Sequence, residues 1–198
     1  MLRRRDVKVA GKKLSNSKKA DKINKHVPYT KALIESEFWR HKSLEDMSNQ
    51  EWEAICDGCA RCCLHKFIDD EALEEDFQPT DHIKEDEEIL YTNIACYLLN
   101  DKTCGCTQYE NRTQLVPDCV TLTKNNLKDI FFMPPSCSYR RLSEGKGLAH
   151  WHPLLNKGKK AKMHQLGVTV RNRIVNESNV DLNQFEDYIV TWPLEDLD

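Results

Sequence analysis

The groups best suited to chemistry in this chain are cysteine thiols, and four of them fall within eight residues. The segment Cys56-Asp57-Gly58-Cys59-Ala60-Arg61-Cys62-Cys63 repeats a spacing of two intervening residues and then adds a further cysteine. Two thiolates at this spacing can chelate one metal ion, as at zinc and iron–sulfur sites. On a helix, three of these thiolates would share a face and repel one another without a cation. If Gly58 breaks the helix, the segment forms a metal-binding knuckle instead.

Five further cysteines follow downstream, so the whole set is a candidate for metal ligation. Thiolates favour zinc, iron–sulfur clusters or copper(I). Because a zinc site takes about four ligands, the set can supply two tetrahedral sites and one spare cysteine, or one multinuclear cluster. The sequence leaves this partition open. The candidate metal ligands are Cys56, Cys59, Cys62, Cys63, Cys96, Cys104, Cys106, Cys119 and Cys137.

Histidine can complete such a ligand set. His65 follows the cysteine cluster by two residues and is the best candidate of its type. His150 and His152 lie two apart, so on a strand they would face the same way and could add a ligand or an acid/base pair. Ordinary packing or turn contacts are the simpler role for this second pair.

Metal ligation competes with two other uses of cysteine, namely burial without a ligand and disulfide formation. The basic start of the chain is not followed by an apolar stretch, so it does not resemble a secretory signal. No run of about 18 apolar residues occurs, and no membrane span is expected. In a reducing cytoplasm disulfides are rare, and nine cysteines cannot all pair. We therefore expect a cytoplasmic protein that uses its thiols for metal or redox chemistry.

The composition indicates that the fold needs an additional stabilising link, such as a bound metal ion. Of 198 residues, 39% are hydrophobic and 31% are charged, which permits only a modest core. Structural zinc contributes roughly 10–16 kcal/mol of apparent binding free energy in small domains, as much as the whole stability of a typical domain. We expect strong chelators to unfold the middle of the protein.

Charge is unevenly spread along the chain. Residues 1–26 hold ten Lys/Arg against two acids, and the remainder is net acidic. We interpret residues 1–28 as a basic disordered arm; because no aromatic side chain interleaves with its charges, a nucleic-acid partner is not expected. Residues 69–88 contain eleven acids and one lysine, and are expected to form an acidic insertion. They lack the alternating ligands and central glycine of an EF-hand loop.

Short elements must position the cysteines. Apolar spacing predicts a helix within residues 29–42, and the Ser48-x-x-Glu51 pattern predicts a second helix that begins near Ser48. Residues 89–99 suggest a strand that turns into a short helix. The remaining elements are expected at 120–132 (helix), 167–175 (strand, with helix as the alternative) and 182–190 (amphipathic helix). The predicted fold is a small, irregular, helix-rich α+β domain over 29–198, with loops tied by metal.

The cluster CDGCARCCLHK resembles the YcgN/YkgJ-type bacterial cysteine-cluster family, which carries a zinc- or iron-chelating domain with the motif CxxCxxCC. The likeness continues through ILYTNIACYLL, TCGCTQYENR, VPDCVTLT, PPSCSYR and WHPLL, and it runs from about Phe38 to the C-terminus. All nine cysteines match the family pattern. The resemblance implies a cytosolic bacterial protein with a metal site, but no known reaction. The basic arm and the acidic insertion depart from the usual form of the family.

Two functional hypotheses follow. In the first, the protein is a metal-binding module with a structural or sensory zinc or iron site. In the second, it is an iron–sulfur or thiol-based redox enzyme that uses the same cysteines, with a nucleophile activated by His65 or His152. An all-thiolate set suits a closed structural site better than an open catalytic one. The sequence assigns neither a reaction nor a protein partner.

Overall fold

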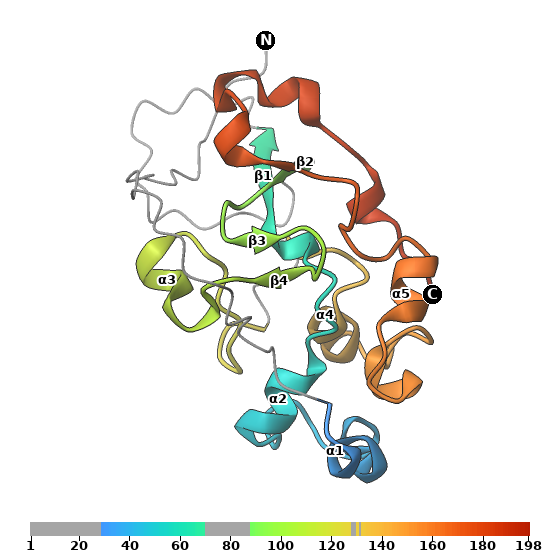
Figure 1. Cartoon of the computed structure of the whole chain (residues 1–198). Coiled ribbons are helices and arrows are strands. Elements are labelled where there is room, and N and C mark those ends of the chain that lie inside the picture. Colours follow the sequence, from blue (N-terminus) through green and yellow to red (C-terminus); the bar gives the residue numbers. More distant parts are fainter. Residues whose placement is uncertain (1–28, 70–87, 128–129, 131) are drawn as a thin grey trace.

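The structure is a computed structural model that describes residues 29–69, 88–127, 130 and 132–198 (Figure 1). The predicted basic arm and residues 70–87 of the predicted acidic insertion lie outside the described residues. Short helices surround two small sheets, which confirms the predicted small, irregular α+β fold, although its helix content is modest. The α-helices are α1 (Lys31–Ser36), α2 (Asn49–Ile55), α3 (Arg112–Leu115), α4 (Ser138–Ser143) and α5 (Ala161–Gln165).

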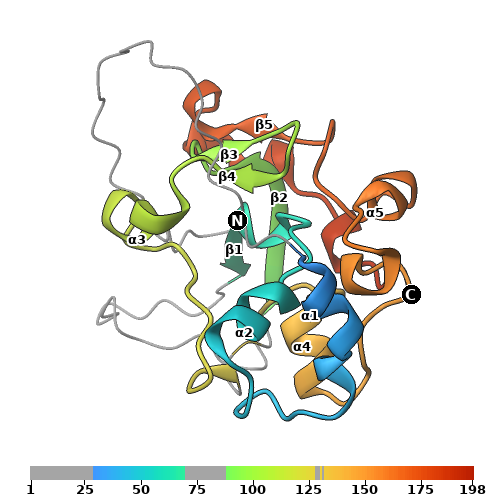
Figure 2. The same cartoon turned by 60° about the horizontal axis from the view of Figure 1, so that its bottom comes forward.

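The larger sheet has three strands in the order β1-β2-β5, and the smaller sheet pairs β3 with β4. β1 and β2 are antiparallel, whereas the short β5 runs parallel to the end of β2. Figures 1 and 2 show both sheets between the helices α1, α2 and α4 at one end and the C-terminal segment at the other. The strands are β1 (Leu64–Asp69), β2 (Glu88–Ala95), β3 (Leu99–Asn100), β4 (Gly105–Cys106) and β5 (Val175–Asn176).

Local capping explains the helix that precedes the cysteine cluster. The Ser48 side chain accepts a hydrogen bond from Glu51 N, and the Glu51 carboxylate accepts one from Ser48 N, so two unpaired donors of the first turn are satisfied. The predicted start of α2 is confirmed. The helix ends at Ile55, since Cys56 has an extended backbone (φ −65°, ψ 117°). The cysteine cluster therefore lies outside the helix.

Three other predicted elements differ from the structure. Residues 120–126 contain turns and no helix, because the Asn126 side chain accepts a hydrogen bond from Thr123 N and donates one to Thr121 O, in competition with the helical backbone pattern. Within 167–175 only Val175 is in a strand. Residues 182–188 form a 3-10 helix with non-helical dihedral angles at Gln184, where an amphipathic α-helix was expected.

The hydrophobic core is divided among several clusters. The largest packs α1, α2 and the start of α4 around fully buried residues such as Phe38 and Ile55. Trp39, Met47 and Trp52 belong to it. A second cluster packs Leu64 and Tyr91 of the larger sheet against Leu99 and Cys104. The cysteines lie where these clusters meet.

None of the helices in the described part of the chain is long and apolar enough to cross a membrane.

Candidate metal centre

The cysteine cluster begins as a loop whose backbone is set by Asp57, Gly58 and Ala60. The Asp57 carboxylate accepts a hydrogen bond from Cys59 N at 2.7 Å and another from the Ser138 hydroxyl at 2.9 Å. Gly58 and Ala60 adopt left-handed conformations, with φ of 69° and 65°. Such angles are easy for glycine and costly for alanine. The knuckle alternative is therefore the observed backbone geometry.

Three side chains, of which Tyr139 and His152 are buried, hold the C-terminal end of α2, from which this loop departs. The hydroxyls of Tyr139 and Tyr29 donate to the carbonyls of Trp52 and Cys56, and His152 Nε2 lies 3.0 Å from Ile55 O. The last carbonyls of a helix have no partner within the helix, so these donors stabilise its end. They fix the position of Cys56 at the start of the cluster.

Arg61 anchors the other half of the loop to the C-terminal segment. Its side chain is fully buried, and it donates hydrogen bonds to Val168 O and the Ser136 hydroxyl. Its Nη1 also donates to the carbonyls of Pro193 and Glu195 at 3.0 Å. Burial of a guanidinium is costly, and among the described residues Nη2 has no hydrogen-bond partner, so the bonds of Nε and Nη1 must offset this cost and hold the loop in position.

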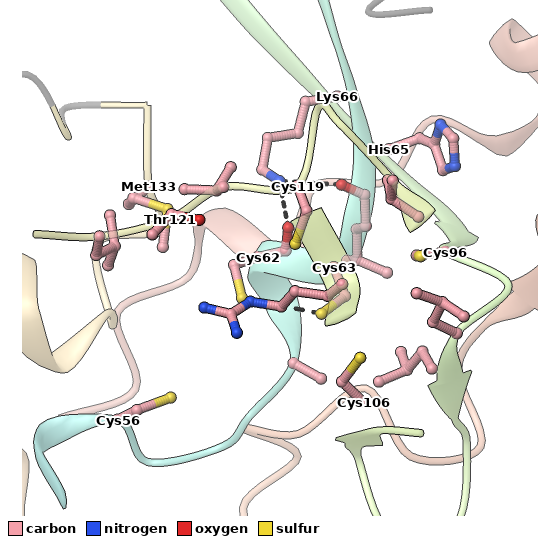
Figure 3. Close-up of a pocket in the computed structure, with 18 of the residues that line it drawn as sticks. Cys56, Cys62, Cys63, His65, Lys66, Cys96, Cys106, Cys119, Thr121 and Met133 are labelled. Carbon is pink, nitrogen blue, oxygen red and sulfur yellow. Dashed lines mark hydrogen bonds between the residues drawn. The ribbon is translucent and has the colours of Figure 1, made fainter. Parts of the chain in front are cut away.

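Seven of the nine cysteines line one cavity of about 700 Å³ between the helices and the sheets. Figure 3 shows labelled sulfur atoms that point into this space from β4, from the turn before β1 and from neighbouring loops. Cys59 and Cys137 are buried and do not line the cavity. The cysteines that line it are Cys56, Cys62, Cys63, Cys96, Cys104, Cys106 and Cys119.

Electrostatic influence links several of these cysteines. Burial, with smaller contributions from Cys106 and Cys119, raises the pKa of Cys96 to about 11. Burial also raises the pKa of Cys119, to which Cys62 and Cys106 contribute. Cys62 and Cys96 both raise the pKa of Cys63. Five thiols that line the cavity are thus connected by successive electrostatic contacts; Cys62 also influences Cys56, which Figure 3 shows to one side of them. We call them the thiol group: Cys62, Cys63, Cys96, Cys106 and Cys119.

The closest pair in the thiol group joins adjacent residues. The sulfur atoms of Cys62 and Cys63 lie 4.0 Å apart. Hydrogen bonding from Cys63 and the charge of nearby Lys66 together lower the pKa of Cys62 to about 7, against the effect of burial. The same contact raises the pKa of Cys63. Cys62 is therefore the thiol that ionises most readily.

Two cations border the thiol group, and sequence reasoning missed both. Lys66 Nζ donates to the carbonyls of Cys62 and Leu64, each at 2.9 Å (Figure 3). The positive charge of Arg112, together with a smaller hydrogen-bond effect, opposes the rise in the pKa of Cys119 that burial causes. Lys66 lies three residues after Cys63, and this proximity was the available signal. Arg112 gave no comparable signal.

The histidines that the sequence suggested as further ligands lie in different parts of the structure. His65 Nε2 lies 2.6 Å from the Glu177 carboxylate, and Figure 3 shows the imidazole turned away from the sulfur atoms of Cys62 and Cys63. His152 is fully buried; its Nδ1 accepts from Leu154 N while Nε2 faces Ile55 O, so both ring nitrogens are engaged in backbone contacts. His150 is exposed beside Asp198. The pair in HWHP is thus a structural feature.

The chemistry of the donors fits zinc or iron. Two sulfur atoms on one tetrahedral zinc ion lie roughly 3.8 Å apart at the usual bond length, close to the Cys62–Cys63 separation of 4.0 Å. Within the described residues, however, no three His, Cys, Asp or Glu side chains are already gathered closely enough to hold an ion. The nine cysteines all lie in this part of the chain, and none is joined in a disulfide.

Comparisons with known proteins agree with this chemistry. Residues 55–138 match the family model described as "CxxCxxCC: Putative zinc- or iron-chelating domain". A "UPF0260 protein" of Parvibaculum lavamentivorans is 47% identical over 160 residues, which is 81% of this chain and 95% of the relative. Those of Sinorhizobium medicae and Shewanella oneidensis are 45% and 44% identical over 161 residues, covering 81% of this chain and 94% and 99% of the relatives. No solved structure matches the chain. The identity and the coverage together place this chain in the UPF0260 family.

Proposed function

We propose that the protein is a cytoplasmic metal-binding module that holds zinc or iron through the thiol group at its central cavity. The observation that carries this proposal is the convergence of five thiols from separate parts of the sequence on one cavity, where neighbouring members influence one another electrostatically. Sulfur anions gathered in this way repel one another unless a cation lies between them. The match to a zinc- or iron-chelating family model supports the same chemistry.

The proposed ligands come from different elements. Cys62 and Cys63 precede and adjoin β1, Cys96 follows β2, Cys106 ends β4 and Cys119 lies beyond α3. A metal bound here would join these elements, so a structural or sensory role suits the site better than a catalytic one. Five donors exceed the four of one tetrahedral zinc, so four of them suffice for one ion and all five allow a multinuclear centre. The other four cysteines are not members of the thiol group, and their role as metal ligands remains a prediction.

Binding would require the sulfur atoms to close around the ion. The cavity gives them room to do so, since its lining includes flexible cysteine side chains on loops and strand ends. The surrounding core also contains the apolar side chains of Leu64, Leu99 and Met133, which would exclude water from a closed site. The type name given by the sequence resemblance, YcgN/YkgJ, remains a prediction.

A pair of cysteine variants tests the proposal. The double variant Cys62→Ala/Cys63→Ala leaves three members of the thiol group, fewer than the four ligands of a tetrahedral zinc ion, whereas Cys59→Ala/Cys137→Ala removes two buried cysteines that do not line the cavity. Elemental analysis of anaerobically purified protein should find bound zinc or iron in the wild type and in Cys59→Ala/Cys137→Ala, and a clear loss in Cys62→Ala/Cys63→Ala. Equal metal content in all three proteins would contradict the proposed ligand group.

A second candidate function rests on the Cys62–Cys63 pair. Adjacent thiols 4.0 Å apart, one of them with a pKa of about 7, are suited to redox chemistry. This corresponds to the iron–sulfur or thiol-based redox alternative. Iron with acid-labile sulfide in the purified protein, or rapid reversible oxidation of the pair in metal-loaded protein, would favour this candidate over a structural or sensory site.

A further inference from the structure

Lys66 is a cation held in a fixed position beside the thiol group. Its ammonium donates to Cys62 O and Leu64 O at 2.9 Å, and it lies 5.1 Å from the centre of the Tyr91 ring. Tyr91 is itself fixed, since it is 1% exposed and donates to Phe132 O at 2.8 Å. A long, flexible side chain is thus confined by three contacts from three directions.

The position of this ammonium matters because of what surrounds it. Lys66 lines the same cavity as the cysteines, and it interacts electrostatically with Cys62, Cys63 and Cys119. Figure 3 shows the end of its side chain above the sulfur atoms of Cys62 and Cys119. Among the described residues, Lys66 forms no hydrogen bond or ion pair with an acidic side chain. Its positive charge is therefore left to interact with the thiols.

The negative charge of a thiolate-bound metal centre explains why a cation beside the thiols matters. Four thiolates around one divalent zinc ion leave two excess negative charges, and thiolate-bound iron–sulfur clusters are also anionic. An uncompensated anion in a partly dry cavity is unfavourable. A fixed ammonium beside the site offsets part of that cost without occupying a ligand position.

We propose that Lys66 is a positioning residue of the metal centre, acting as the fixed counter-cation that stabilises its excess negative charge. This inference rests on the proposed function, since it concerns the same site. The alternative is that Lys66 only ties the carbonyls of Cys62 and Leu64 together. The two roles differ in what they require, because the first depends on positive charge and the second on hydrogen-bond donors.

Substitutions at Lys66 separate the two roles. Lys66→Gln removes the charge but keeps an amide donor, and Lys66→Arg keeps the charge. Lys124 provides a matched control, because its ammonium also donates to two backbone carbonyls, Glu45 O and Met47 O, away from the cavity. Lys124→Gln therefore removes the same charge and the same type of contact elsewhere.

The test is zinc affinity, measured on the full chain by competition with a chromophoric chelator at pH 7.5, after circular dichroism has verified folding. We expect Lys66→Gln to weaken zinc binding by about tenfold or more, and Lys66→Arg and Lys124→Gln to stay within about threefold of the wild type. The loss should persist in high salt, since partly buried charges are screened less than exposed ones. If iron is the resident metal, its reduction potential should become more negative in Lys66→Gln, because the lysine charge favours the reduced, more anionic state.

The outcomes are distinguishable. Absence of zinc and iron binding by the wild-type chain would overturn both the proposed function and this inference. Tight binding by the wild type together with equal affinities in Lys66→Gln and Lys124→Gln would overturn the inference alone, as would a failure of Lys66→Arg to restore affinity. If Lys66→Gln does not fold, Lys66→Asn, which also lacks the charge and keeps an amide donor, takes its place in the same comparison.

Discussion

Arg61 Nη1 donates a hydrogen bond to the backbone carbonyl of Pro193 at 3.0 Å, although 132 positions separate these residues in the sequence. Arg61 sits between Cys59 and Cys62, so this contact ties the centre of the cysteine cluster to the C-terminal segment. The Arg61 guanidinium also lies 5.6 Å from the ring of Trp192. The conformation of the cluster therefore depends on the end of the chain.

Substitution of Arg61 should consequently destabilise the fold. Arg61→Met leaves several buried carbonyls without a donor, and we expect the free energy of unfolding to fall by about 3 kcal/mol. Urea denaturation of the wild type and the variant measures this change. Arg40→Met is the control, since Arg40 is exposed and pairs only with Glu37 at the surface; it should change stability by less than about 0.5 kcal/mol. A similar small effect at both positions would refute the structural role of Arg61.

Cys62 should be the first thiol to react in the reduced, metal-free protein. Hydrogen bonding from Cys63 lowers its pKa to about 7, whereas burial raises that of Cys137 to about 12. Because the thiolate is the nucleophile, iodoacetamide should modify Cys62 with a pH midpoint near 7. Peptide mass spectrometry over a pH series locates the modified residue. Faster modification of Cys137, or an ordinary midpoint near about 8.5 for Cys62, would contradict the described environment.

The Glu177 carboxylate should stabilise the fold only above acidic pH. Burial raises its pKa, but hydrogen bonds from His65 and Tyr97 N outweigh this effect, and the pKa lies below the ordinary value of 4.5. A lowered pKa in the folded state means that the stabilisation is present above about pH 4.5 and is lost as the pH falls through the folded-state value.

Glu177→Gln should accordingly lower the free energy of unfolding at pH 7 by about 1–2 kcal/mol, and this deficit should shrink below pH 4. Urea unfolding at pH 7 and pH 3.5 gives both values. Glu186→Gln, at an exposed position, serves as the matched control and should behave as the wild type at both pH values. A deficit for Glu177→Gln that is the same at both pH values would argue against an ionised, hydrogen-bonded carboxylate.

His152 should contribute to stability and not to metal binding. Its two ring nitrogens contact Ile55 O and Leu154 N in a fully buried site, and burial lowers its pKa, so the neutral ring is the stable form. We expect His152→Leu to reduce the free energy of unfolding by about 1–3 kcal/mol while the metal content stays at the wild-type value. Loss of metal from a folded His152→Leu protein would show that this histidine is a ligand.

Local signals in the sequence predicted some elements and missed others for identifiable reasons. The start of α2 follows from the Ser48–Glu51 capping box, which involves only neighbouring residues. The expected helix at 120–132 failed in its described part because Lys124 and Asn126 make hydrogen bonds that pattern analysis does not see; Lys124 contacts Glu45 and Met47, almost eighty residues earlier. Long-range contacts decided the irregular segments.

The candidate site was likewise predictable from the sequence only in part. All nine cysteines were evident from the sequence, and a non-helical cluster was one of two stated alternatives, although the helix ends at Ile55, before Gly58. The grouping of five thiols was not evident, since it depends on the pairing of β1 with β2 and of β3 with β4, which brings Cys96 and Cys106 to the cavity. Lys66 was missed because its role depends on the direction of a strand side chain relative to sulfur atoms from other segments.

The most direct test of the central claim is the metal content of the full chain, purified without oxygen and without added metal. We expect at least one equivalent of zinc or iron to stay bound through gel filtration. A strong chelator should remove this metal, and the circular dichroism signal of the folded protein should then be lost. Zinc should give a colourless preparation and an iron–sulfur cluster a brown one. Freshly purified protein that is fully folded and contains neither metal would contradict the claim that cations hold these thiols together.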